Sequence, residues 1–257
     1  MNVGVQFAAP LDQMIGQSAE GIKSEFATDL PKFEPMQMLT ISFAMPQSSA
    51  LSYGSAPVLS GFNLTKPKSD GSPARVLRLV SNILSVHFFE YTSWQETKTQ
   101  AISYIARCLQ SLLVLDRDPI TAVLLRYVDR FTFDGVAQEA SASLLFRPDT
   151  KFVASRILGA GHQWHSNCGW FEPLTGTAPT LHQLNVSSGI IQEACAVIVD
   201  HNSVYTLSKP YSSVSELKQG EGAASLEAIL ERQHRANADM LKNLLNQEML
   251  DTIGLRG

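Results

Sequence analysis

Two arginines, Arg126 and Arg130, lie in the run ITAVLLRYVDRFTF, whose residue types favour a β-strand. The side-chain period of a strand is two, so both arginines are expected on one face and Tyr127 on the other. A guanidinium donates in a fixed fork to phosphate and carboxylate groups, and these two side chains could hold an anion. The alternative is that both pair with acidic side chains on an opposing helix or a neighbouring strand.

His234 and Asn237 interrupt the apolar stripe of a helix expected from about Leu226 to Leu250. A polar side chain on a buried face must be hydrogen-bonded or lie beside a cavity. One interpretation makes His234 a general base or a ligand contact, because histidine titrates in the range that suits both tasks. The other has it hydrogen-bonded to a sheet carbonyl or to another helix.

His162, His165 and Cys168 have the residue types of metal ligands, and a fourth ligand could come from His182 or His201. On a strand, however, His162 and Cys168 share a face while His165 lies on the other. The three side chains would converge only if the segment bent into a loop. We therefore expect neither a metal site nor a cofactor.

Three aromatic residues, Trp164, Trp170 and Phe171, lie in the same segment. Aromatic side chains are enriched at the energetic centres of protein interfaces, so these residues are candidates for contact with a protein partner or a second copy. The alternative is a packed hairpin inside one chain.

Composition and charge restrict the partners. The 257 residues include 20 Lys+Arg and 24 Asp+Glu, a net charge of −4, which disfavours nucleic acid as a partner. No apolar segment approaches the ~20 residues of a membrane span, so no membrane partner is expected. The three cysteines form no CxxC pair, and we expect a cytoplasmic protein.

Common catalytic motifs are absent from the sequence: it holds no GxGxxG, GxxxxGK[ST], GxSxG or HExxH. We therefore favour a non-enzymatic protein-interaction or binding protein, which could self-associate. An enzyme or sensor for an anionic small molecule stays open as the alternative. It would place Arg126, Arg130 and His234 in one pocket.

The elements that must position these side chains form an α+β pattern with two subdomains, residues 1–135 and 136–257, each an antiparallel sheet packed by a long helix. In the first, Ser93 and Glu96 have the spacing of a capping box and predict the start of a long helix. We also expect a strand over Gln37–Met45 and a helix over Ser141–Leu158 that is divided near Pro148. Later in the chain we expect a tight turn at 200–203, a polar linker at 215–225 and a last helix that ends at Gly254.

The segments NILSVHFFEYTSWQETKTQ, LLRYVDRF and LERQHRANADMLKNLLNQEMLDTIG, in this order, resemble a sporadically distributed prokaryotic family of about this length. The matching positions are Tyr91, Trp94, the Arg126–Arg130 strand and His234, while Asp129 stands where the family usually has Asn. The resemblance implies a self-contained α+β protein with no assigned activity. The family's patchy occurrence is similar to that of accessory genes, such as defence or toxin–antitoxin components.

Overall fold

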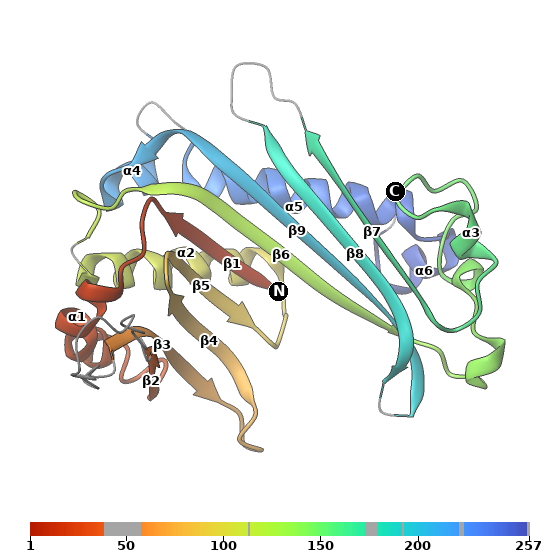
Figure 1. Ribbon diagram of the computed structural model, residues 1–257, viewed down its shortest axis with the longest axis horizontal. Helices are drawn as coiled ribbons and strands as arrows, with labels where there is room; N and C mark the ends of the chain where they lie inside the picture. Colours follow the sequence, from red (N-terminus) through yellow and green to blue (C-terminus); the bar gives the residue numbers. More distant parts are fainter. Residues whose placement is uncertain (39–57, 113, 173–178, 192, 221–223, 256–257) are drawn as a thin grey trace, which may run out of the picture. The chain divides into compact units, whose positions relative to one another are not determined.

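The computed structural model describes residues 1–38, 58–112, 114–172, 179–191, 193–220 and 224–255 (Figure 1). Contacts divide the chain into two compact units. The N-terminal unit comprises residues 2–122 and 209–223, and the C-terminal unit comprises Met1, residues 123–208 and residues 224–257. The expected boundary at residue 135 thus differs from the one that the contacts give, because most of the strand that begins at Ile120 belongs to the C-terminal unit.

The described elements confirm the α+β class, and the strands pair antiparallel. In chain order they are β1 (Asn2–Phe7), α1 (Asp12–Glu25), β2 (Lys32–Met38), β3 (Val58–Pro67), β4 (Pro73–Val80), β5 (Ile83–Phe88), α2 (Trp94–Leu112), β6 (Ile120–Thr132), the 3-10 turns η1 (Ala137–Glu139) and η2 (Ala142–Leu144), α3 (Ser155–Leu158), β7 (Trp164–Glu172), β8 (Thr180–Ile191), β9 (Ala194–Tyr211), α4 (Val214–Gln219), α5 (Leu226–Leu244) and α6 (Gln247–Thr252).

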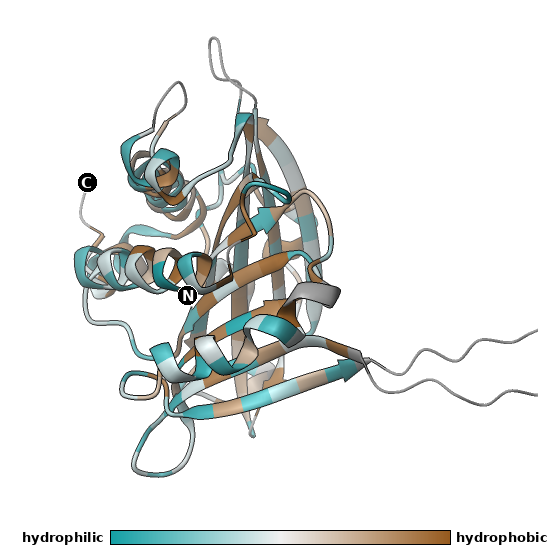
Figure 2. Cartoon of the chain, turned by 90° about the vertical axis from the view of Figure 1, so that its left-hand side faces the viewer, coloured by the Kyte–Doolittle hydropathy of each residue, from teal (hydrophilic) through white to brown (hydrophobic). Residues whose placement is uncertain are grey.

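In the N-terminal unit the strand order is β2-β3-β4-β5-β1, and α2 packs against β1 and β5. The residues of α2 at helical spacing, Ala101, Ile105, Cys108 and Leu112, are buried as the sequence predicts. Figure 2 shows hydrophobic residues gathered along the strands, while the helices carry hydrophilic residues on their outward sides. The apolar face of α2 therefore supplies much of the core of this unit.

Only one of the two hydrogen bonds of the expected capping box forms at the start of α2. The backbone N–H of Glu96 donates to the Ser93 hydroxyl at 3.3 Å, as predicted. The Glu96 carboxylate, however, accepts from the Thr92 hydroxyl at 2.5 Å. The Thr92 hydroxyl therefore donates to Glu96 in place of the backbone N–H of Ser93, which the capping box predicts as the donor.

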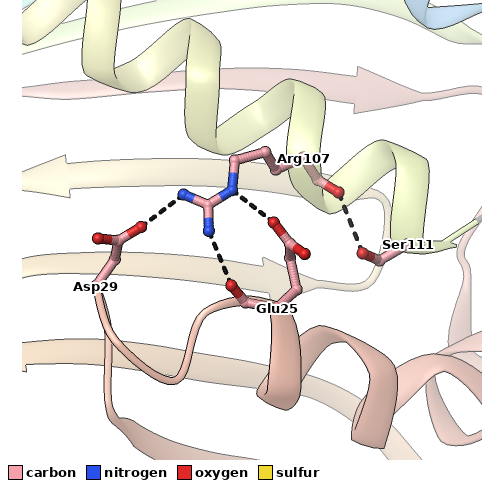
Figure 3. Close-up of polar contacts among 4 residues, drawn as sticks. All are labelled: Glu25, Asp29, Arg107 and Ser111. Atoms are coloured by element: carbon pink, nitrogen blue, oxygen red, sulfur yellow. Dashed lines mark hydrogen bonds and ion pairs between the residues drawn. The ribbon is translucent and has the colours of Figure 1, made fainter.

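Arg107 ties α2 to the segment that follows α1 (Figure 3). Its guanidinium donates to the Glu25 carboxylate at 2.7 Å, to the Asp29 carboxylate at 2.6 Å and to the Glu25 carbonyl at 2.8 Å. The same group lies 4.5 Å from the centre of the Phe26 ring. One side chain thus fixes the position of the α1 terminus on α2.

In the C-terminal unit the strand order is β6-β9-β8-β7, which makes β7 the edge strand of this unit. Alternate residues of β7, β8 and β9 point inward, and α5 packs over this inner face through contacts to β6 and β9. An apolar cluster fills one end of the layer and includes Phe146, Leu184, Val199 and Leu244.

The tight turn expected at 200–203 is wrong: these residues are the middle of the long strand β9. Polar residue types suggested a turn, but the side chains of Asp200, His201 and Asn202 each have a partner within the sheet. Asp200 and Asn202 point outward to Arg126 and Gln183, while His201 and Ser203 are buried on the inner face. Side-chain pairing here overrides the low strand propensity of the sequence.

The helix expected over Ser141–Leu158 is also wrong, because the segment holds only η2 and the short α3. Pro148 lacks the N–H that a helix needs, and the Ser141 hydroxyl accepts from the Ser143 N–H, which favours a turn. The apolar spacing that suggested a helix instead serves packing, since Phe146 and Ile157 are buried in the cluster.

The last helix is broken in two. Leu245 is extended and bridges Phe146, and Asn246 then starts α6 by accepting from the Met249 N–H at 2.9 Å. Gly254, with a φ of +74°, follows α6 as expected. The polar linker expected at 215–225 overlaps α4, which Ser213 caps through the Glu216 N–H, and residues 221–223 of it lie outside the described part.

Of the strand expected over Gln37–Met45, only the first two residues belong to β2, and residues 39–45 lie outside the described part. Among the described residues, no helix is long and apolar enough to cross a membrane.

Candidate functional site

Arg126 and Arg130 lie on the outward face of β6, as the alternation predicts. Arg126 is paired with Asp200 of β9: Nε donates to Oδ1 at 2.7 Å and one terminal nitrogen to Oδ2 at 2.6 Å. The hydrogen bonds to Asp200 raise the pKa of Arg126 above its usual range. Arg130 donates to the Ile191 carbonyl at 3.4 Å. For Arg126, the expectation of an acidic partner on a neighbouring strand is therefore confirmed.

His234 belongs to the opposite side of β6. Its Nδ1 lies 2.7 Å from the hydroxyl of Tyr127, a buried residue on the inward face. The structure therefore does not bring His234 together with Arg126 and Arg130, and the pocket expected from these three residues does not form. The expectation that the polar interruption of α5 is hydrogen-bonded is confirmed, with a tyrosine hydroxyl as the partner of His234.

The segment with metal-ligand residue types is a regular strand from Trp164 onward, so His165 and Cys168 point to opposite faces. The Cys168 thiol donates to the Phe152 carbonyl at 3.4 Å, and burial raises the pKa of this thiol. Across the described ranges, no three His, Cys, Asp or Glu residues are grouped so that they could hold a metal ion. His162, His165 and Cys168 in particular do not converge.

The three interface candidates have different surroundings. Trp164 packs edge-on against Phe146, with ring centres 5.8 Å apart, and Trp170 packs against Phe152 at 5.0 Å. Both tryptophans are half-buried against the apolar cluster. Phe171 points outward and is 64% exposed. Only Phe171 presents a whole aromatic ring to the surface.

An apolar pocket lies beside Trp164 in the C-terminal unit. Its walls are Phe131, Phe133, Val197 and Met249, together with Trp164 and Leu145, and the side chains of Ser188 and Cys195 also line it. Its cavity volume is about 100 Å³. An apolar cavity of ~150 Å³ holds a benzene ring, so this smaller pocket has room for about one branched aliphatic side chain.

The rim of the pocket is apolar as well. Leu144 of η2 lines it and is 53% exposed. Val136, just before η1, is another exposed aliphatic side chain in the segment that leads to the pocket. A pocket with such a rim suits an apolar group that enters from outside.

A second feature is a polar chain on the inner face of the sheet. Glu172 Oε2 lies 3.2 Å from His182 Nε2, His182 Nδ1 lies 3.1 Å from His201 Nε2, and His201 Nδ1 lies 2.8 Å from Asn237 Oδ1. The two histidines are 1% exposed, and the ring of Trp170 lies nearly parallel to both. The chain therefore runs from the end of β7 through the interior to α5.

Burial controls the titration of this chain. Loss of solvation lowers the pKa of His182, against the raising effect of Glu172. It lowers the pKa of His201 to about 4, against the raising effect of the hydrogen bond to Asn237. Both rings are therefore neutral at pH 7.

The neighbouring inner face carries further buried polar atoms. Gln233 Nε2 donates to the carbonyls of Val123 and Ser203 at 3.2 and 3.0 Å. The side-chain oxygens of Gln233, Ser203 and Thr180 are buried and have no hydrogen-bond partner among the described residues. This part of the interior is polar where a purely structural core would be apolar.

Sequence reasoning missed the histidine chain and the pocket. The sequence indicates His182 and His201 only as possible metal ligands, and no pattern in it distinguishes Glu172, Gln233 or Cys195 as site residues. The one available signal was Asn237 on the buried stripe of α5, which required a hydrogen-bond partner. The identity of that partner, His201, and its contact with His182 depend on the strand register. This register pairs His182 with Ser203, two residues from His201.

No protein-family model and no curated protein sequence matches this chain. Among solved structures, the crystal structure of the di-domain ARO/CYC StfQ from the steffimycin biosynthetic pathway is similar over 94% of this chain and 95% of that chain. The sequence identity is 12% and the TM-score is 0.24. A likeness at this level carries no argument about function.

Proposed function

We propose that this protein acts by binding a protein partner, and that the pocket beside Trp164 receives one apolar side chain of that partner. The observation that carries the proposal is the pocket itself: apolar walls, an exposed apolar rim at Leu144 and a volume of about 100 Å³. Interface hot spots combine a buried anchor side chain with a fitted pocket. Ligand pockets for cofactors are larger, at ~300–1,000 Å³.

The proposal includes the context that the family resemblance implies, an accessory subunit of a defence or toxin–antitoxin system. It also includes two subdomains, each with an antiparallel sheet and one long helix, of which the C-terminal one carries the pocket. The alternative, an enzyme or sensor for an anionic small molecule, has no support from the arginines, because Arg126 is already paired with Asp200.

The test uses complexes isolated gently from the native host and weighed by native mass spectrometry. We expect the wild-type chain to carry a stoichiometric second protein. Leu144→Asp puts a charge on the rim, and Gly161→Phe fills the pocket from a position where an added Cβ meets no atom within 4 Å. Both variants should lose the partner.

The matched control is Val128→Asp, which places the same charge on another exposed aliphatic residue of this unit, on the outward face of β6 and outside the pocket lining. It should keep the partner. Retention of the partner by Leu144→Asp and Gly161→Phe would overturn the proposal. A wild-type chain that carries only a second copy of itself, or only a small apolar molecule, would also overturn it.

A further inference from the structure

The polar chain of Glu172, His182, His201 and Asn237 has three contacts, and each is a hydrogen bond only if one of its two atoms carries a proton. An ionised carboxylate and an amide oxygen can only accept hydrogen bonds. With Glu172 at one end and the Asn237 oxygen at the other, both outer ring nitrogens must donate. The two inner ring nitrogens share one more proton, so the filled chain holds three protons on two imidazoles, and the histidine pair carries one positive charge beside the negative charge of Glu172.

A neutral histidine pair holds only two protons. All three contacts can then be filled in one way only: the Asn237 amide turns so that its nitrogen donates to His201 Nδ1. His201 Nε2 then donates to His182 Nδ1, and His182 Nε2 donates to Glu172. The number of protons on the pair and the orientation of the Asn237 amide therefore depend on each other.

We propose that this chain is a binding site for a single proton, and that proton uptake is coupled to a half-turn of the Asn237 amide on α5. The proton comes from solvent by way of Glu172, whose side chain is 42% exposed and ends the chain at β7. The Asn237 oxygen faces His201 Nδ1 in the proton-bound form, which is the orientation that the structure shows at 2.8 Å, and the amide nitrogen faces it in the neutral form. Uptake forms one N–H bond on the pair, net at His201 Nδ1, and breaks the O–H bond of the water or carboxyl group that delivers the proton.

The groups around the pair support a site that binds one proton and no more. Glu172 faces it from β7, and Asp200, which is paired with Arg126, acts on His201 from β9. Among the contacts described, the groups of α5 near the histidine pair are neutral amides. The Asn237 amide contacts His201, and the Gln233 amide contacts the carbonyl of Ser203, two residues further along β9. The like charges of a doubly protonated pair would lie in contact, with one half-exposed carboxylate to balance them.

Coupling matters because the two ends of the chain belong to different parts of the C-terminal unit. Glu172 is the last residue of the edge strand, and Asn237 is in the middle of the helix that covers the sheet. Uptake of the proton changes the hydrogen bond between Asn237 of α5 and His201 of β9, while the one from Gln233 to the Ser203 carbonyl stays. This site is independent of the apolar pocket and does not rest on the proposed function.

The test is NMR of the intact protein labelled with 15N in its histidine rings, with His182→Gln and His201→Gln used to assign the signals. At pH 7 we expect both rings to be neutral with the proton on Nε2. On acidification they should change together in a step of one proton, below the ordinary range of histidine.

Two variants separate the coupling from simple burial. Asn237→Asp fixes an acceptor at the α5 end, so the pair should take up its proton at least about one pH unit higher. Glu172→Gln removes the carboxylate from a half-exposed position that does not threaten folding, and it should lower the same midpoint by about one unit. Glu248→Gln, on the exposed side of α6, is the control and should leave the midpoint unchanged.

A proton on His201 Nδ1 at pH 7 would overturn the proposal, because the amide would then face the pair with its oxygen before any proton is bound. Independent titration of the two rings would also overturn it. So would a midpoint that Glu172→Gln does not move, even if Asn237→Asp fails to fold.

Discussion

The carboxylate of Asp200 accepts two hydrogen bonds from the guanidinium of Arg126, at 2.7 and 2.6 Å, across the neighbouring strands β9 and β6. Arg126 is 49% exposed, so solvent screens the pair despite its good geometry. We expect a double-mutant cycle with Arg126→Met and Asp200→Asn to give a coupling of about 0.5–1 kcal/mol in urea unfolding. The coupling should shrink in 1 M salt. A coupling that does not depend on salt would contradict this view of an exposed pair.

Arg107 has a different role, because it makes a fork of contacts that a lysine cannot reproduce. It reaches two carboxylates, one carbonyl and the face of Phe26. We expect Arg107→Lys to lower the free energy of unfolding by about 1–2 kcal/mol, although the charge is kept. Arg78→Lys, at an exposed arginine of the same unit, is the control and should cost less than about 0.5 kcal/mol. Equal costs for the two substitutions would show that the fork adds no stability.

The buried histidine pair predicts a loss of stability in acid. The pKa of His201 is about 4 in the folded protein and about 6.5 when unfolded, so the unfolded chain binds more protons between these values. Stability from this group is complete above pH 6.5 and falls as the pH drops toward 4. The loss should reach up to about 3 kcal/mol.

Urea unfolding between pH 7 and 4.5 measures this loss, and His201→Gln should flatten the curve relative to the wild type. A wild-type curve that is already flat over this interval would contradict the burial of a neutral His201. Replacement of His165, which is exposed, with Gln should leave the curve unchanged.

The cysteines should differ in reactivity. Burial raises the pKa of Cys108 strongly and that of Cys168 to a smaller extent, and only the thiolate reacts with alkylating agents. We expect iodoacetamide at pH 8 to modify Cys168 slowly and Cys108 only after unfolding. Peptide mass mapping after short exposure checks this order. Rapid modification of Cys108 in the native protein would show that the core of the N-terminal unit opens.

The sequence predicted those parts of the molecule in which local pattern and tertiary packing agree. The period of α2, the alternation of β6 and the hydrogen-bonding need of Asn237 were all correct. The errors have a common physical origin. At residues 200–203 and 141–158, long-range partners decide the backbone, and no local propensity contains them.

The candidate sites were harder to predict for the same reason. The alternation of β6 predicts the face on which Arg126 lies, but whether His234 faces that side depends on how α5 packs on the sheet. The histidine chain needs the register of β8 on β9 and the rotation of α5 at once. The apolar pocket needs the irregular segment between β6 and β7, whose path a single sequence does not determine.

The order of the C-terminal unit along the chain bears on how the protein is made. Strands β6 to β9 are synthesised before α5, which supplies Gln233 and Asn237 to their inner face. During translation this face, including His182 and His201, stays exposed to solvent until α5 has been synthesised and packs over it. Such a unit depends on contacts between distant parts of the chain, which slows folding and prolongs the time in which an uncovered sheet can meet other chains. A chaperone that shields growing chains would therefore be most useful to this protein in the interval between β9 and α5.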